Sequence, residues 1–266
     1  MYEKIYTFLF LKPWPIWKYL WRLQAKTHPL VLPMITLIII STFTVSTYSL
    51  TNHFSESRDY STFDSKLIID DKIPFIKHTI LIYGIYYLLF SLMAFSTPLR
   101  KKGLIECIFA NQILFILSSL CFMIFMLVPI KIDTRIGINT GEGLIASFYD
   151  TLYLADPPFN SWPSLHVVHS IFLSGIIIRW MKISQGVLRF PNSDNKRLLL
   201  FKEKIFPIIM WIICASIIIS TMTTKQHYFF DIVTGIIVGF AGIYIMNKCI
   251  KTVENNTEEL TKYLES

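Results

Sequence analysis

Six stretches of this sequence are apolar and long enough, or nearly so, to cross a lipid bilayer. A transmembrane helix needs about 20 predominantly apolar residues, and only helices or closed barrels satisfy every backbone group inside a membrane. We predict spans over residues 29–50, 74–96, 104–128, 165–181, 205–222 and 228–247. The sequence therefore predicts an all-α integral membrane protein, built as a bundle of six transmembrane helices.

The composition excludes an ordinary soluble domain. Only 16% of the 266 residues are charged, 53% are hydrophobic, and the mean hydropathy is +0.50. A soluble domain is about one quarter charged, so this chain has too few charges to cover a water-facing surface. The four cysteines are far apart and fall in or beside apolar stretches, which favours buried thiols over disulfides. No metal-ligand spacing is present, and we predict neither a metal nor another cofactor.

The basic residues are distributed unevenly between the connections. The net charge is +7, and 18 of the 25 lysines and arginines lie before the first span, after the last, or in the connections on that same side. The positive-inside rule therefore places both termini in the cytoplasm. This distribution explains the charge without a nucleic-acid partner. Residues 51–73, 129–164 and 223–227 then face the extracytoplasmic side.

We expect a single membrane domain across residues 1–266. Residues 1–28 mix tryptophans with lysines, a composition typical of an interfacial helix on the inner leaflet. Residues 29–247 make the six-helix bundle. Residues 248–266 make a polar cytoplasmic tail, which we expect to be helical and mobile.

Unusual polar side chains gather at the outward ends of spans three to six. Ionisable groups at membrane depth are costly and are functional candidates by default. The candidates are Lys131, Arg135, Ser164, His166, Lys225, His227 and Asp231. Three separate parts of the chain thus bring cations, a hydroxyl group and two histidines to one face of the membrane.

His227 and Asp231 are four residues apart, so they share one face of a helix. Asp231 can accept a hydrogen bond from one ring nitrogen, which leaves the other nitrogen free as a nucleophile or base. The alternative is that the two side chains only satisfy each other inside the bundle. Asp231 is the only acidic residue in span six, which favours the functional interpretation.

Ser164 follows Pro163 and is placed to open a helix, whose free N–H groups and positive dipole end suit a phosphate. His166 can act as an acid or a base. The alternative is a capping serine followed by an interfacial histidine.

The cations in this group suit a phosphate as well. Lys131 and Arg135 can neutralise phosphate oxygens, or they are simply solvated loop charges. Lys225 lies four residues after Thr221 and would share its face if that turn is helical.

Together these residues resemble the phosphatidic acid phosphatase type 2 superfamily, which includes lipid phosphate phosphatases and lipid phosphotransferases. Residues 163–166 (PSLH) match the family motif Pro-Ser-x-His. Residues 220–231 match Ser-Arg-x5-His-x3-Asp, except that Thr221 stands where arginine is usual. The first family motif, Lys-x6-Arg-Pro, is absent, and Lys131-x3-Arg135 is its nearest counterpart.

The resemblance covers roughly residues 129–239 and implies phosphoryl transfer without a metal. His227 would attack phosphorus to form a phosphohistidine, Asp231 would orient His227, and His166 would protonate the leaving oxygen. The phosphate ligands implied are Ser164, Lys131 and Arg135. We hypothesise that Lys225 supplies the contact of the missing arginine.

The favoured interpretation is a phosphatase that hydrolyses the phosphomonoester or pyrophosphate of a membrane lipid. Its site would face the extracytoplasmic side of the plasma (inner) membrane. Candidate substrates are phosphatidate, phosphatidylglycerophosphate, an isoprenyl pyrophosphate and a phosphorylated lipid A. A lipid phosphotransferase is the first alternative, because the region of His227 and Tyr228 also resembles sphingolipid headgroup transferases. A non-catalytic membrane scaffold is the second alternative.

Overall fold

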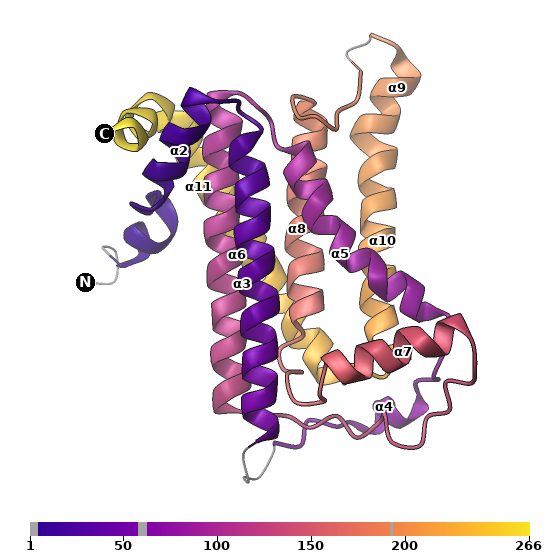
Figure 1. Ribbon diagram of the computed structural model, residues 1–266. Coiled ribbons are helices and arrows are strands. Elements are labelled where there is room, and N and C mark those ends of the chain that lie inside the picture. Colours follow the sequence, from indigo (N-terminus) through magenta and orange to yellow (C-terminus); the bar gives the residue numbers. More distant parts are fainter. Residues whose placement is uncertain (1–4, 58–62, 192–193) are drawn as a thin grey trace.

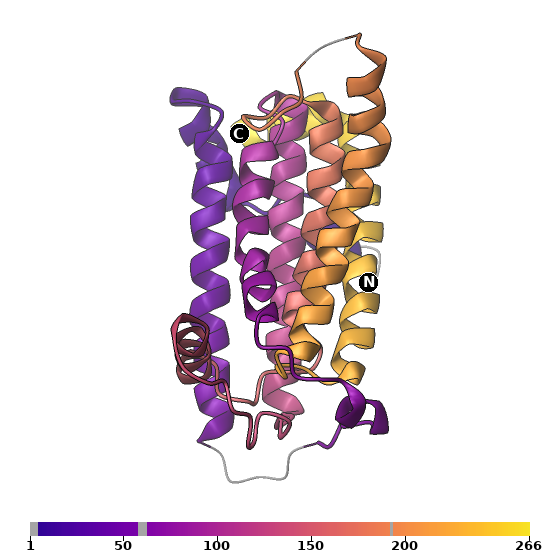
Figure 2. The same cartoon turned by 90° about the vertical axis from the view of Figure 1, so that its right-hand side faces the viewer.

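The computed structural model describes residues 5–57, 63–191 and 194–266. Within these residues, six long apolar helices run alongside one another as a bundle (Figures 1 and 2). They are α3 (Val31–Glu56), α5 (Thr79–Ser96), α6 (Lys101–Leu127), α8 (Leu165–Ile183), α10 (Phe206–Thr223) and α11 (Phe229–Glu265). The prediction of an all-helical, multi-pass membrane protein with six spans is confirmed.

The last two long helices extend beyond the apolar stretches that predict them. A short helix α9 (Lys196–Leu200) and a π-helical segment (Phe201–Ile205) lead into α10 and lengthen it at the basic end. Helix α11 continues to Glu265, with a kink at Asn256. Lysine and glutamate are good helix formers, so both helices persist where the chain leaves the apolar region.

The C-terminal tail is helical as predicted, but it is docked on the rest of the protein. Its side chains Leu260 and Leu264 are buried. The Lys18 ammonium, from helix α2 (Trp17–Lys26), lies 4.2 Å from the centre of the Tyr263 ring. The tail therefore packs against the N-terminal helix.

The N-terminal segment forms two short helices, whereas the sequence predicts a single interfacial helix. Residues 1–4 of this segment lie outside the described ranges. The same is true of residues 58–62 in the segment 51–73, which is predicted to face outward. A π-helical turn (Thr7–Leu11) precedes α2, and Pro13 and Pro15 separate the two because proline interrupts a helix. The Trp17 side chain is buried, and its Nε1 donates to Gln112 Oε1 at 2.9 Å. Helix α2 is therefore attached to α6.

The opposite end of the bundle carries the segments that the distribution of basic residues predicts to face outward. Helix α7 (Leu144–Ala155) runs across the bundle near the ends of the long helices (Figure 1). Helix α4 (Ile68–Lys72) lies at the same end but on the opposite side of the bundle, and both are far from α2 and the C-terminus (Figure 2). The sequence analysis did not anticipate α7. Gly143 precedes it with φ 90°, a conformation that favours glycine, and this glycine followed by an apolar stretch is the signal that was overlooked.

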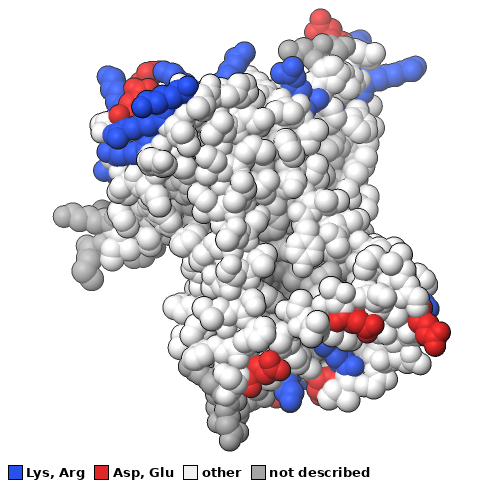
Figure 3. Space-filling model, viewed as in Figure 1, with Lys and Arg blue, Asp and Glu red and all other residues white. Residues whose placement is uncertain are grey.

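On the face of the molecule that Figure 3 shows, charged side chains lie at the two ends. Figure 3 shows lysines and arginines gathered around the end that holds α2 and α9, an uncharged middle band, and mixed charges at the end of α4 and α7. Large apolar side chains are exposed on the long helices, including Ile38, Leu88, Ile212 and Ile237. This uncharged band is the surface that suits contact with lipid.

Helices α8 and α11 pack closely because glycines of α11 face α8. A Cβ atom placed on Gly235 would lie 3.0 Å from the Ser164 carbonyl oxygen and from Val167 Cβ. A Cβ on Gly239 would lie 2.9 Å from Ile171 Cβ. Small residues of this kind let helix backbones approach in membranes. The close approach brings the first turns of α8 and α11 together.

Candidate active site

The candidate site lies where α8 and α11 begin. Ser164 occupies the N-cap position of α8, and its N–H donates to the Asp231 carbonyl oxygen at 3.1 Å. In α11, Asp231 Oδ2 accepts the Tyr228 N–H at 3.0 Å and so caps its own helix. Two helix N-termini are therefore joined by a backbone hydrogen bond at one point.

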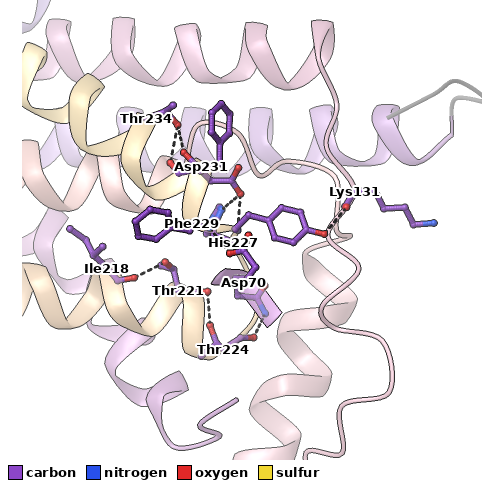
Figure 4. A network of polar contacts seen from close by, with 12 residues as sticks. Asp70, Lys131, Ile218, Thr221, Thr224, His227, Phe229, Asp231 and Thr234 are labelled. Atoms are coloured by element: carbon purple, nitrogen blue, oxygen red, sulfur yellow. Dashed lines mark hydrogen bonds and ion pairs between the residues drawn. The ribbon is translucent and has the colours of Figure 1, made fainter. Parts of the chain in front are cut away.

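His227 lies in the tight connection between α10 and α11. The N–H groups of Gln226 and His227 both donate to the Thr221 carbonyl oxygen, at 2.9 Å and 3.3 Å, which closes the turn. His227 Nδ1 lies 3.5 Å from Asp231 Oδ2 (Figure 4). This distance suits an ion pair but is long for a hydrogen bond. Nδ1 therefore faces the carboxylate, and Nε2 is the nitrogen left for other chemistry.

His166 lies opposite His227. The ring centroids are 5.8 Å apart, and both residues are buried. The rings of Tyr83 and Tyr86, both from α5, flank His166 at 4.6 Å and 4.4 Å. The two histidines thus come from different segments, the first turn of α8 and the connection before α11, and their rings lie close together.

Several buried polar atoms around the histidines have no hydrogen-bond partner among the described residues. They include Ser164 Oγ, both ring nitrogens of His166, His227 Nδ1 and Asp231 Oδ1. Buried polar atoms are almost always satisfied in folded proteins, so a group of unsatisfied ones indicates a place for a polar ligand or water.

A cavity of about 310 Å³ reaches His166 from the side of the bundle. Its walls come mainly from α3, α5, α7 and α8 and are largely apolar or aromatic, including Tyr48, Tyr83, Tyr87, Leu152 and Leu165. Val45 and Tyr87, which line it, are 63% and 54% exposed, so the cavity opens between α3 and α5. An apolar chain can therefore reach His166 from the uncharged band.

Arg135 is held beside the histidine loop by an acidic partner. Its Nη1 donates to the Asp156 carbonyl oxygen at 2.6 Å, and its Nη2 lies 3.5 Å from Asp156 Oδ2. Nη2 also donates to the side-chain oxygen of Gln226, the residue before His227. Tyr48 and Asn52 donate to the same Asp156 carboxylate, both at 2.8 Å. Arg135 is thus close to the site, with part of its charge already balanced.

Lys131 is near the site in the fold, but its ammonium is not. The Tyr228 hydroxyl donates to Asp133 Oδ1 at 2.7 Å, and this bond fixes the segment of Lys131 onto α11. The Lys131 side chain is exposed and extends away from His227 (Figure 4). Its ammonium lies 5.8 Å from the Phe159 ring centre.

The shared face expected for Thr221 and Lys225 is not formed. Helix α10 ends at Thr223, and Lys225 has φ 58°, a left-handed conformation that interrupts the helix. Its Nζ donates to the carbonyl oxygens of Asp70 and Ile73, at 3.2 Å and 2.5 Å. Burial lowers the pKa of Lys225, and the nearby Asp70 carboxylate opposes that shift. The shared helical face from which the hypothesis for Lys225 was argued is therefore absent, and its role as a phosphate ligand stays a prediction.

Three residues around the histidines were missed by the sequence analysis. Asp156 and Gln226 hold Arg135, and Asp70 accepts the Phe229 N–H at 2.7 Å. Asp156 and Gln226 lie close in the sequence to the histidine motifs, which was the available signal. Asp70 comes from a distant segment, and nothing local marks it.

His169, one turn after His166, belongs to a different network. Its Nδ1 and Nε2 lie 2.8 Å from the hydroxyls of Tyr86 and Ser118, so it links α5, α6 and α8. All four cysteines are buried and free, as predicted. In the residues that the structure describes, no three histidine, cysteine, aspartate or glutamate side chains come close enough to hold a metal ion.

The fold defines the protein as a multi-pass membrane protein, and comparison with known families goes further. Residues 133–254 match the model of the PAP2 superfamily, so this chain carries a PAP2 superfamily domain. The matched residues include Arg135, His166 and His227, and the match begins after Lys131. No curated protein and no solved structure matches the chain. A domain of this superfamily implies an activity of the lipid phosphatase or phosphotransferase type.

Proposed function

We propose that this protein is a lipid phosphate phosphatase that works through a phosphohistidine and needs no metal. The observation that carries the proposal is the pair of buried histidines, 5.8 Å apart, of which His166 lines a cavity with largely apolar walls. A phosphorylated lipid suits this arrangement because its chain matches the cavity and its phosphate matches the unsatisfied polar atoms.

In the first step, His227 Nε2 attacks phosphorus while the bond from phosphorus to the lipid oxygen breaks. His166 gives a proton to that oxygen, so the alcohol leaves neutral. Asp231 faces Nδ1 and stabilises the positive charge that develops on the ring. In the second step, water attacks the phosphohistidine, His166 takes a proton from this water, and inorganic phosphate is released.

The phosphate would be held chiefly by the first turn of α8 and by Arg135. Ser164 Oγ is buried and free to donate, and the N–H groups of a helix start favour an anion. Arg135 donates a hydrogen bond to the side chain of Gln226, the residue before His227. Lys131 reaches the phosphate only if its exposed side chain turns inward.

We place this site on the extracytoplasmic side of the plasma (inner) membrane. Lysines and arginines gather at the opposite end, with α2 and the C-terminus, which supports a cytoplasmic position for both termini (Figure 3). In this arrangement the chain is one membrane domain, with α2 at the inner leaflet and the phosphate at headgroup depth.

A lipid phosphotransferase is the second candidate, and one observation favours it. His227 is 6% exposed and Ser164 is fully buried, so bulk water has little access to the phosphohistidine. A lipid or sugar hydroxyl that enters through the cavity would then compete with water as the acceptor.

The test is phosphate release by the purified full chain in detergent, with EDTA, from a panel of lipid monophosphates and pyrophosphates. We expect release from the wild type and none from His227→Ala or His166→Ala. Water labelled with oxygen-18 should place the label in the released phosphate. If no phosphate is released and a labelled headgroup is recovered on an added acceptor lipid, the protein is a phosphotransferase and not a phosphatase. If both variants kept full activity, the histidine mechanism would be refuted.

A further inference from the structure

The segment between α3 and α5 contributes a buried carboxylate to the neighbourhood of His227. Asp70 belongs to the short outward helix α4, yet it is only 2% exposed. Its Oδ1 accepts the Phe229 N–H and its Oδ2 accepts the Leu67 N–H, both at 2.7 Å. Aspartate is rarely buried unless it is paired, so these two N–H groups explain its position.

Asp70 also holds the chain on the other side of His227. Its carbonyl oxygen accepts a hydrogen bond from Lys225 Nζ at 3.2 Å, and the neighbouring Ile73 carbonyl accepts from the same nitrogen. Lys225 has the left-handed φ of 58°, which is unfavourable for a side chain with a Cβ and persists only where contacts enforce it. Asp70 thus contacts the residue two before His227 and the residue two after it.

Further contacts extend this connection. The Ile76 N–H donates to the Thr223 carbonyl oxygen at 3.0 Å, and the hydroxyls of Thr79 and Thr223 lie 2.8 Å apart. Figure 4 shows Asp70 beside the loop that carries His227, with Asp231 on the other side of that histidine. The loop is therefore held between two carboxylates from distant parts of the chain.

We propose that Asp70 is a positioning residue that keeps His227 between Asp231 and His166. Its carboxylate fixes the backbone at residue 229, its carbonyl oxygen holds the Lys225 ammonium, and it needs no contact with the substrate. The proposal rests on the proposed function of His227. In this arrangement α4 is part of the site, in addition to its place in the connection between two long helices.

The neighbouring Asp71 provides a matched control. Its side chain is 65% exposed and pairs with Lys66 at 2.8 Å on the surface. Asp71→Ala therefore removes the same charge from the same short helix without touching the histidine loop. Asp70→Asn is the graded variant, because an amide keeps one acceptor oxygen and presents an NH₂ group to the other N–H.

The experiment measures amide hydrogen exchange and steady-state kinetics of the full chain in detergent. In Asp70→Ala we expect residues 224–231 to exchange at least about tenfold faster, since the Phe229 amide loses its acceptor. We expect kcat to fall at least about tenfold while KM changes less than about twofold, because positioning and not binding is lost. Asp70→Asn should lie between, and Asp71→Ala should match the wild type.

Lys225→Met gives a second route if Asp70→Ala does not fold. It removes only the ammonium contacts, and we expect faster exchange over the same residues. The proposal would be overturned if residues 224–231 exchanged at the wild-type rate in both Asp70→Ala and Lys225→Met. It would also be overturned if Asp71→Ala lost as much kcat as Asp70→Ala. If the wild type releases no phosphate from any lipid, the proposed function fails, and the exchange data alone still decide whether Asp70 holds the loop.

Discussion

Replacing Gly235 with alanine tests whether the close packing of α8 on α11 holds the two histidines in register. The new Cβ would lie 3.0 Å from the Ser164 carbonyl oxygen and from Val167 Cβ, whereas ordinary contacts begin at 3.4 Å. The helices must therefore separate locally by about 0.4 Å. A carbonyl oxygen in a helix start cannot rotate away as a flexible side chain can, so Ser164 moves with it.

The expected effect on catalysis is larger than the effect on stability. A misplacement of about 1 Å costs about a hundredfold in rate, so a shift of about 0.4 Å should lower kcat by roughly fivefold to tenfold. For stability, alanine gains up to about 1 kcal/mol in helix propensity, and overpacking costs about 1–3 kcal/mol. We expect a net loss of about 0–2 kcal/mol in the free energy of unfolding.

The assay is phosphate release by Gly235→Ala at saturating lipid, together with thermal unfolding in the same detergent. Gly84→Ala is the matched control, because Gly84 is also helical and a Cβ there would meet nothing within 4 Å. We expect wild-type activity from Gly84→Ala. Equal kcat and equal unfolding midpoints for the two variants would refute the argument that the close approach of α8 and α11 sets the geometry of the site.

Two further substitutions separate stability from catalysis. The Glu106 side chain is 1% exposed and accepts a hydrogen bond from Arg179 Nη2 at 2.9 Å. We expect Glu106→Ala to lower the free energy of unfolding by about 1–3 kcal/mol, as measured in a denaturant titration. No loss of stability would mean that water replaces the carboxylate. His169→Leu leaves the hydroxyls of Tyr86 and Ser118 without their shared partner, which should cost about 1–2 kcal/mol. The folded fraction of this variant should keep its kcat within about threefold, and complete loss of activity in folded protein would place His169 in the site.

Hydropathy was sufficient to predict the six spans, because length and apolarity are local properties of the chain. It could not predict where α10 and α11 end, since a helix continues into water wherever its residues favour helix and a neighbour covers one face. Leu260 and Leu264 show this: they are buried on α2, which lies far away in the sequence. The same reason explains the N-terminal segment, in which Trp17 binds Gln112 of α6.

The juxtaposition of His166, His227 and Asp231 followed from the spacing and topology of two helix starts, and the structure brings these three residues together with Ser164. The surroundings of Lys225 did not follow, because the conformation of one residue after Thr223 decides where its ammonium points. Contacts such as Asp70 with the Phe229 N–H depend on where a distant loop folds back. No local pattern carries that information.

The distribution of charge around the histidines also indicates which helix start binds the phosphate. At the start of α11, the N–H groups of Tyr228 and Phe229 are already taken by two carboxylates, those of Asp231 and Asp70. The first turn of α8 has no acidic residue, and Ser164 Oγ is unsatisfied. Since a helix start attracts anions only where its N–H groups remain free, the phosphate should rest on α8, with His227 facing it from the connection before α11. Buried dipoles are screened less by salt than surface charges, so KM should depend only weakly on ionic strength, and a steep dependence would indicate that exposed cations such as Lys131 dominate binding.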